Sequence, residues 1–338
     1  MKKNINILIL MLTALILFTP IVCSTPSTTI ISEFTVENTP PSILAAELYE
    51  SDEQTFTTQI TPQTEYALKI TVSDSNTLQD ISEITVIIFY DTDSNGVGIP
   101  PSTDSPQQRA TYTWTPSGGW RLTGPLGSSW TINGTGSRQP TDLTAITGDW
   151  WLHFTPAKTA HEAGGTTDWD ITIKVKDSSG ATAEIGKYGY AMNWYGEITA
   201  NAAQFSFGTV SPGIQNKPIE KVDGTPTDHI AVTVTANGNY RILVKADSTW
   251  TTPEGYQATL DIDNMLDDGE FELYTSVNGT PTTKVVSSST TVQGWDGLTG
   301  PTSEAGSQHT SYWWITLAPD GLMVGTYTGT ITYVLSQA

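Results

Sequence analysis

The sequence predicts an all-β protein made of two consecutive antiparallel β-sandwich domains. Three observations support this fold class. Apolar and polar residues alternate with a period of two through most of the chain. No amphipathic helical pattern follows residue 24, and turn-rich segments separate the alternating runs. Strands of this kind bury one face against a second layer, which is how a sandwich is built.

The first 24 residues have the pattern of a secretory signal peptide. Two lysines precede a short apolar run, and Val22 and Ser24 occupy the −3 and −1 positions of a cleavage site before Thr25. The apolar run is short for a membrane span, and no second one follows. We therefore expect a secreted protein without a transmembrane segment, either extracellular or associated with the cell surface.

Export has consequences for the cysteine and for two asparagines. Cleavage before residue 25 removes Cys23, the only cysteine, so the mature chain has no disulfide or thiolate metal ligand. The alternative is that Cys23 carries a lipid anchor. Asn133 and Asn278 each begin an Asn-Gly-Thr pattern and are candidate glycosylation sites.

The chain is strongly acidic. It has 35 acidic and 15 basic residues, and loss of Lys2 and Lys3 with the signal peptide takes the formal net charge from −20 to −22. Such a chain does not bind nucleic acid by neutralising phosphates. We expect its partners to be cations, a cell-envelope polymer or surface glycan, or further copies of itself.

Residues 25–199 are predicted to form the first, Ig-like sandwich domain. In "YALKITVS" and "DITIKVKD" the large apolar residues occupy alternate positions, and "DSSGA" predicts a hairpin turn. Strands are expected near 31–37, 43–49, 54–60, 66–73, 82–90, 109–115, 128–133, 149–155, 170–177, 181–185 and 188–195.

Residues 200–338 are predicted to form the second sandwich domain. Its strongest local pattern is "HIAVTVTANGNYRILVKA", in which two alternating runs flank Asn237-Gly238. This dipeptide favours the two-residue turn of a β-hairpin. Later strands are expected in "FELYTSV", "TTKVVSSS", "SYWWITLA" and "GTYTGTITYVL".

The segment "FYDTDSNGVG" contains a candidate calcium loop. Asp91, Asp93, Asn95 and Gly96 match the first half of an EF-hand loop. Ser102 stands where that loop needs a bidentate glutamate, and no helix follows, so an EF-hand is excluded. The three oxygen-bearing side chains still predict a calcium site.

Other acids are needed to complete such a site. Asp104, Asp74 or Asp80 are the candidates, if the fold brings one of them close. The alternative is a solvated loop whose aspartates and asparagine only shape the turn.

The eleven tryptophans suggest either core packing or sugar binding. Trp150 and Trp151 are neighbours on a predicted strand and are expected to point to opposite faces. Trp120 and Trp295 lie among glycines and are expected to be the most exposed, which makes them candidates for stacking on a glycan.

Catalytic patterns are missing from the sequence. The four histidines are widely separated, and there is no Gly-x-Ser-x-Gly elbow and no thiol nucleophile in the mature chain. A pair of carboxylates for glycoside hydrolysis leaves no sequence signature. We therefore expect a protein that is not an enzyme.

The first domain resembles bacterial and archaeal Ig-like surface domains. The resemblance lies in "VENTPPSI" (36–43), in "ITVSDSNTLQDISEITVIIFYDTD" and in "WDITIKVKDSSGATAE". It implies a sandwich of seven to nine strands that serves as a spacer, adhesive or coat element, with no transferable active site.

The second domain is similar to the Trp-x-Leu cell-surface domain. "FSFGTVSPG" (205–213) resembles its opening strand and "GTYTGTITYVL" (325–335) its closing strand. Tyr240 and Tyr333 stand where that family has tryptophan. The resemblance implies a sandwich located at the cell envelope.

Together these observations predict a non-enzymatic secreted protein of the cell surface or envelope with a structural or adhesive role. One alternative is a pilus-like filament subunit, in which Ser27–Val36 completes the sheet of a neighbouring copy. Another is a carbohydrate-binding module with exposed tryptophans and calcium. A third is a β-sandwich enzyme acting on glycans.

Overall fold

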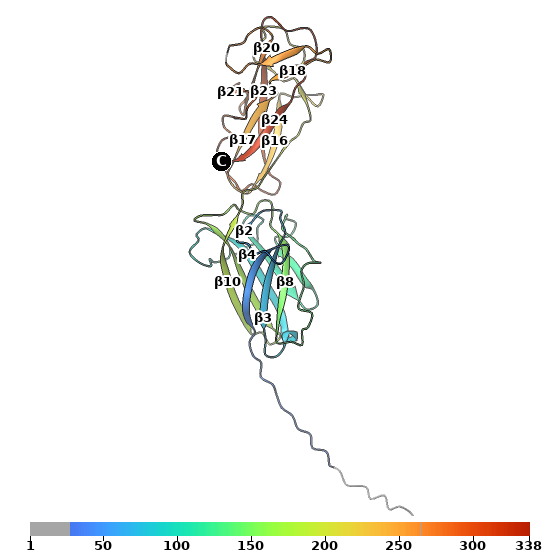
Figure 1. The fold of residues 1–338 in the computed structure, drawn as a ribbon, viewed down its shortest axis with the longest axis vertical. Coiled ribbons are helices and arrows are strands. Elements are labelled where there is room, and N and C mark those ends of the chain that lie inside the picture. The colour runs from blue at the N-terminus through green and yellow to red at the C-terminus, as the bar shows by residue number, and fades with distance from the viewer. Residues whose placement is uncertain (1–27, 264) are drawn as a thin grey trace, which may run out of the picture. The chain divides into compact units, whose positions relative to one another are not determined.

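The computed structural model describes residues 28–263 and 265–338, which are organised as β-structure (Figure 1). Residues 38–338 form one compact unit. The preceding residues 28–37 are exposed and belong to no strand, so the strand predicted at 31–37 is wrong. The predicted signal peptide lies outside the described residues.

The first ten strands form two sheets. Their orders are β1-β3-β8-β7 and β2-β10-β9-β4-β5-β6, and all pairs are antiparallel except β2 with β10. The strands are β1 (Ser42–Glu50), β2 (Gln59–Ile60), β3 (Tyr66–Ser73), β4 (Ile81–Asp91), β5 (Arg109–Thr115), β6 (Gly119–Gly124), β7 (Thr131–Ile132), β8 (Thr147–Thr155), β9 (Asp168–Asp177) and β10 (Thr182–Met192). A single 3₁₀ turn, η1 (Leu78–Asp80), precedes β4.

Aromatic side chains join these two sheets into a sandwich. Trp114 of β5 meets Trp150 of β8 edge to face, with ring centroids 5.4 Å apart. Both rings are buried within one apolar core. Trp151 lies on the other face of β8, where the Arg138 guanidinium is 5.1 Å from its ring. The predicted opposite orientation of the two neighbouring tryptophans is confirmed.

The remaining strands surround a second core. One sheet has the order β11-β16-β23-β20-β19-β18, with β13 on β23 and β21 on β20; two smaller sheets are β12-β14-β15 and β22-β17-β24. The strands are β11 (Gly196–Ala200), β12 (Phe205–Ser206), β13 (Lys217–Pro218), β14 (Lys221–Val222), β15 (Thr225–Pro226), β16 (His229–Ala236), β17 (Tyr240–Ala246), β18 (Thr249–Thr251), β19 (Gln257–Leu260), β20 (Glu270–Ser276), β21 (Thr283–Val285), β22 (Thr290–Thr291), β23 (Ser307–Leu317) and β24 (Ile331–Gln337).

A polar contact ties two sheets of this second core together. Trp313 of β23 donates its indole N–H to the hydroxyl of Tyr333 on β24 (2.9 Å). The Tyr333 hydroxyl also shares a hydrogen bond with Ser311 (2.7 Å). Burial raises the pKa of Tyr333 to about 12. This hydroxyl therefore stays protonated and satisfies the buried polar groups around it.

The hairpin predicted at Asn237-Gly238 is wrong. Strands β16 and β17 flank this dipeptide, but β16 pairs with β11 and β23, whereas β17 pairs with β22 and β24. Asn237 is fully buried, and its amide donates to the carbonyls of Ala160 and Asn193 (both 2.9 Å). The turn therefore connects two sheets, because tertiary hydrogen bonds outweigh the local preference for a hairpin.

The all-β fold class is confirmed, but several strand bounds differ from the prediction. The segments 54–60 and 128–133 contribute only β2 and β7, and 181–185 and 188–195 merge into the single strand β10. The hairpin turn predicted at "DSSGA" is present between β9 and β10. The division into domains 25–199 and 200–338 stays a prediction. Among the described residues, no helix has the length and apolarity needed to span a membrane.

Candidate cation site

Three aspartates meet where β4 ends and β9 begins. The antiparallel register places Asp91, the last residue of β4, directly opposite Asp168, the first residue of β9. Asp170 lies two residues further along β9, on the same face as Asp168. We call these three residues the Asp91 cluster. One ligand atom from each lies within 4.8 Å of the others.

The carboxylates of this cluster are buried without enough hydrogen-bond donors. Asp168 is 4% exposed and Asp170 is 0% exposed. Both oxygens of Asp168, Oδ1 of Asp170 and Oδ2 of Asp91 lack a hydrogen-bond partner. Burial raises the pKa of Asp168; the nearby Gly189 N–H partly opposes this effect, and the charges of Asp91 and Asp93 add to it. Buried carboxylates normally have partners, so these oxygens are candidate ligands for a cation.

The pKa values of Asp168 and Asp170 also favour a cation at this cluster. Burial raises the pKa of Asp170 to about 6, the Gly98 N–H opposes this, and the negative charges of Asp168, Asp91 and Asp93 raise it further. Burial likewise raises the pKa of Asp168. Ionising these groups together is therefore costly, and a divalent cation among them would relieve the cost.

The segment after Asp91 folds back to cover the cluster. Gly98 N–H donates to Asp170 Oδ2 (2.6 Å). A Cβ atom at Gly98 would lie 2.3 Å from Asp91 Oδ2, so only glycine lets the backbone approach this closely. Without this segment, Asp168 and Asp170 would lie on the outer, solvent-facing side of the sheet.

The spacing of the three ligand atoms is compatible with a calcium ion. Calcium binds carboxylate oxygens at about 2.3–2.6 Å, so two ligands of one ion lie at most about 5 Å apart. The 4.8 Å limit within the Asp91 cluster meets this condition.

The predicted loop residues divide between this cluster and the solvent. Asp91 belongs to the cluster, while Asp93 and Asn95 are exposed. Asp93 accepts a hydrogen bond from Asn95 N–H (3.2 Å), as a turn residue does. Asp168 and Asp170 were missed by the sequence analysis. The sequence pattern that could have indicated them is two acidic residues at alternate positions at the start of a strand, since such residues share one face.

The acids expected to complete the site lie elsewhere. Asp104 is exposed and forms an ion pair with Arg109, with 3.0 Å between its Oδ1 and Nε. Asp74 and Asp80 belong to a separate cluster with Asp177. The expectation that one of these acids joins Asp91 is therefore corrected: the strand pairing brings Asp168 and Asp170 instead.

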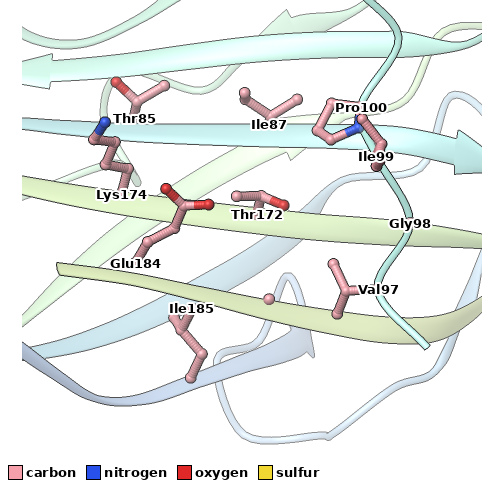
Figure 2. Close-up of a pocket in the computed structure, with 11 residues that line it drawn as sticks. Thr85, Ile87, Val97, Gly98, Ile99, Pro100, Thr172, Lys174, Glu184 and Ile185 are labelled. Carbon is pink, nitrogen blue, oxygen red and sulfur yellow. The ribbon is translucent and has the colours of Figure 1, made fainter.

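A groove of about 520 Å³ lies beside the Asp91 cluster, between the outer face of the sheet and the covering segment. Figure 2 shows Val97–Pro100 crossing the face that carries Thr172 and Glu184. Val97 lies so close to Gly186 that a Cβ atom there would be 2.6 Å from a Val97 methyl carbon. Lys174 and Glu184 supply charged groups to the groove. The segment that covers the aspartates therefore also forms one wall of this groove.

The tryptophans predicted to be exposed are buried. Trp120 is 8% exposed and Trp295 is 2% exposed, and each belongs to an apolar core. The expected exposure is wrong, because sheet neighbours cover both rings despite the adjacent glycines. Trp151 and Trp194 are half-buried, and the other tryptophans are buried. Neither Trp120 nor Trp295 presents an open ring face to a sugar.

The two candidate glycosylation sites differ in accessibility. The Asn133 amide nitrogen is half-buried and donates to the Glu65 carboxylate (3.0 and 3.3 Å). Asn278 is exposed, and its side-chain oxygen accepts a hydrogen bond from Thr280 N–H (3.4 Å). Glycosylation at either position stays a prediction, with Asn278 the more accessible.

No family model and no curated protein matches this chain. Among solved structures it is similar to BcpA, the major pilin subunit of Bacillus cereus (TM-score 0.22, 10% identity, covering 72% of this chain and 69% of that one). It is also similar to a DUF4466 family protein from Parabacteroides merdae (TM-score 0.23, 11% identity, covering 82% of this chain and 99% of that one). A third similar structure is a chain of the chaperone–tip adhesin complex of CFA/I fimbriae (TM-score 0.23, 10% identity, covering 75% of this chain and 84% of that one). Similarity at these TM-scores carries no argument about function.

Proposed function

We propose that this chain is a secreted, non-enzymatic surface protein with a structural or adhesive role, and that calcium at the Asp91 cluster braces its first sandwich. The observation that carries the calcium part is Asp168, a buried carboxylate whose two oxygens both lack partners. The surface role is supported by the signal-peptide pattern and the continuous β-structure. Extracellular calcium is abundant enough to occupy sites of modest affinity.

Calcium would act on the neighbouring groove through the covering segment. The Gly98 N–H donates a hydrogen bond to Asp170, and the adjacent Val97 and Ile99 line the groove. An ion held by the aspartates would fix this wall in place. The groove is lined mainly by apolar side chains, and Thr172 and Lys174 add polar groups. This mixture suits a glycan of the envelope, whose sugar rings offer both apolar faces and hydroxyl groups.

The experiment uses the mature secreted chain, with calcium and with chelator. Its melting temperature and its co-sedimentation with envelopes of the source cells are measured together. At free calcium 100-fold above Kd we expect a stabilisation of about 2.7 kcal/mol. For unfolding of the whole chain in one step this corresponds to a rise of roughly 4 °C, and for unfolding of the first sandwich alone to roughly 5–10 °C. Sedimentation should be stronger with calcium than with chelator.

Asp168→Asn is the decisive variant, because it removes one charge and keeps the shape. It should lose the part of the calcium-dependent rise that the Asp91 cluster supplies, and it should melt above the wild type in chelator. Asp142→Asn, at an exposed turn where the side chain accepts from Thr144 N–H (2.9 Å), is the matched control and should behave like the wild type. A wild-type melting temperature unchanged by chelator would overturn the calcium proposal. Absence of sedimentation under every condition would overturn the surface role.

A second candidate function, a filament subunit, is favoured by the residues before the compact unit. Ile30, Ile31, Phe34 and Val36 are 84%, 92%, 88% and 68% exposed. Three of them, at even positions, would share one face of an extended strand. Exposed apolar residues with this spacing suit addition to the sheet of another copy.

The second sandwich has a groove that fits such a strand. Its volume is about 600 Å³, and it lies between β12 and the segment 322–328. The larger apolar residues that line it include Phe205, Phe207, Trp250, Phe271, Leu322, Met323 and Val324. Lys221 and Asp223 add one charge of each sign to this lining. The occupant we propose is residues 28–36 of a second copy.

Sedimentation velocity of the mature chain tests this candidate. Phe34→Asp places a charge on the face that enters the groove and should abolish assembly. Ile31→Asp, on the opposite face, is the control and should leave most of the assembly intact. A wild-type chain that stays monomeric at high concentration, or equal loss in both variants, would contradict strand addition.

A further inference from the structure

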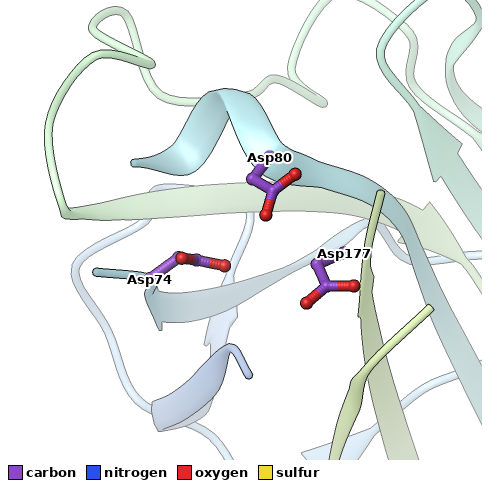
Figure 3. A group of neighbouring side chains, drawn as sticks. All are labelled: Asp74, Asp80 and Asp177. Atoms are coloured by element: carbon purple, nitrogen blue, oxygen red, sulfur yellow. The ribbon is translucent and has the colours of Figure 1, made fainter. Parts of the chain in front are cut away.

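A second group of buried carboxylates lies at the other end of the β4–β9 pair. Asp80 closes η1 just before β4, and Asp177 is the last residue of β9, paired with Ile81. Asp74 follows β3 directly. Figure 3 shows the three side chains converging from these separate segments. We call Asp74, Asp80 and Asp177 the Asp177 cluster.

The two clusters are far apart. Strand β4 has 11 residues and runs from one cluster to the other. At about 3.3 Å per residue, its ends are roughly 30 Å apart. The clusters share no residue, so ligand binding at each should be independent.

The Asp177 cluster also lacks compensating charge. Asp74 and Asp177 are each 1% exposed, and Asp80 is half-buried. Asp74 Oδ1 accepts the Asn76 N–H (2.8 Å), but its Oδ2 has no partner. Among the described residues, no Lys, Arg or His side chain forms an ion pair with any of the three. Three carboxylates thus lie together with an unpartnered buried oxygen among them.

Their geometry fits one divalent ion. One ligand atom from each residue lies within 4.8 Å of the others, the limit set by two calcium–oxygen bonds of about 2.4 Å. Burial raises the pKa of Asp74, the Asn76 N–H lowers it, and the charges of Asp80 and Asp177 raise it further. A cation would convert this repulsion into attraction.

The cluster also holds the first residues of the compact unit. The Asn38 amide donates to Asp177 Oδ2 (2.8 Å), and Thr39 N–H donates to Asn76 Oδ1 (2.7 Å). Asp177 Oδ1 accepts the Ala181 N–H (2.7 Å). An ion bound here would therefore order the groups that anchor residues 38 and 39.

We propose that Asp74, Asp80 and Asp177 bind a calcium ion that fixes Asn38 and Thr39, the first residues of the compact unit, to the sandwich. The all-oxygen ligand set is that of a hard cation, and three carboxylates on a partly open site suit the 10⁻⁴–10⁻³ M affinity range of extracellular calcium modules. This inference concerns a different site from the Asp91 cluster and does not rest on it.

Equilibrium dialysis of the mature chain against radioactive calcium counts the sites. The wild type and the control Asp142→Asn should bind two equivalents. Asp74→Asn and Asp168→Asn should each bind one, and the double variant none. Two equivalents retained by Asp74→Asn, or no binding by Asp168→Asn alone, would overturn the second site. A double variant that still binds one equivalent of calcium would also overturn the second site.

Hydrogen exchange of the wild type tests the proposal without any variant. Calcium should slow exchange at least several-fold in peptides that contain the amides of Thr39, Asn76 and Ala181. A peptide from β16, which contacts neither cluster, is the internal control and should not change. Exchange at these three amides that is the same with calcium and with chelator would overturn the inference, whatever happens at the Asp91 cluster.

Discussion

Glu53 holds two basic side chains at the surface of the first sandwich. Both of its oxygens accept from the Arg138 guanidinium (2.6 Å each), and Oε1 also contacts His153 Nε2 (2.9 Å). His153 is buried, and its Nδ1 lies 2.8 Å from Glu65 Oε1. A bidentate arginine–carboxylate pair of this kind is stronger than an ordinary surface ion pair.

This arrangement predicts a loss of stability in acid. Hydrogen bonds from Arg138 lower the pKa of Glu53 from 4.5 to about 2, against the effect of burial, and His153 lowers it further. A carboxyl whose pKa is lower in the folded state stabilises the protein above its unfolded pKa. That contribution is lost as the pH falls from about 4.5 towards 2. Melting temperatures of the wild type should therefore decline across this range.

Glu53→Gln is the variant that isolates the effect. Its melting temperature should be lower at neutral pH and should decline less steeply below pH 4.5 than that of the wild type. Glu254→Gln, at an exposed position, should reproduce the wild-type profile. Identical pH profiles for Glu53→Gln and the wild type would show that another group carries the acid sensitivity.

At the scale of the element, the two Asn-Gly turns of the second core show how context decides the role of one dipeptide. Asn278-Gly279 is exposed, and Gly279 has a φ of 76°, as a tight turn requires. Asn237 is buried instead, and its Oδ1 also accepts the Tyr195 N–H (2.7 Å). The Asn-Gly dipeptide thus forms a local turn at residues 278–279, whereas at residues 237–238 it makes hydrogen bonds to distant segments and connects two sheets.

Alanine substitutions should separate these roles. Asn237→Ala leaves the carbonyls of Ala160 and Asn193 and the N–H of Tyr195 without a partner. We expect it to lower the free energy of unfolding by roughly 2–4 kcal/mol. Asn278→Ala, the matched control, should change it by about 0.5 kcal/mol or less. Urea unfolding measures both, and equal small effects would contradict the junction role of Asn237.

Strand β4 and strand β9 form the element that links the two proposed calcium sites. Strand β9 has an aspartate at each end, and β4 ends at Asp91 and directly follows Asp80, because their antiparallel register aligns Asp91 with Asp168 and Ile81 with Asp177. Between these ends the pair is apolar on its inner face. Calcium at both ends would therefore restrain the central strands of the larger sheet from fraying.

At the scale of the whole molecule, the negative net charge opposes self-association, and bound calcium would weaken that repulsion. With the predicted signal peptide removed, the chain carries a formal charge of −22, and such a charge repels further copies and anionic surfaces. Two calcium ions, one at each aspartate cluster, would reduce it to −18. The assembly tested with Phe34→Asp and Ile31→Asp should accordingly be stronger in calcium than in chelator.

The sequence by itself determined the all-β class, the opposite faces of Trp150 and Trp151, and the role of Asp91 as a candidate cation ligand. These follow from period-two alternation and from loop chemistry, which are local properties. Asp93 and Asn95 looked equally suitable in sequence, because spacing along a loop does not show which side chains turn to solvent.

Only the tertiary structure decided which residues meet. The register of β4 with β9 brought Asp168 and Asp170 to Asp91. Hydrogen bonds across the chain turned the expected hairpin at Asn237 into a connection between sheets. Strand pairing, and the loops that cover a sheet face, depend on contacts between residues far apart in the chain. No local pattern encodes those contacts, so sheet order and burial emerge only when the whole chain packs.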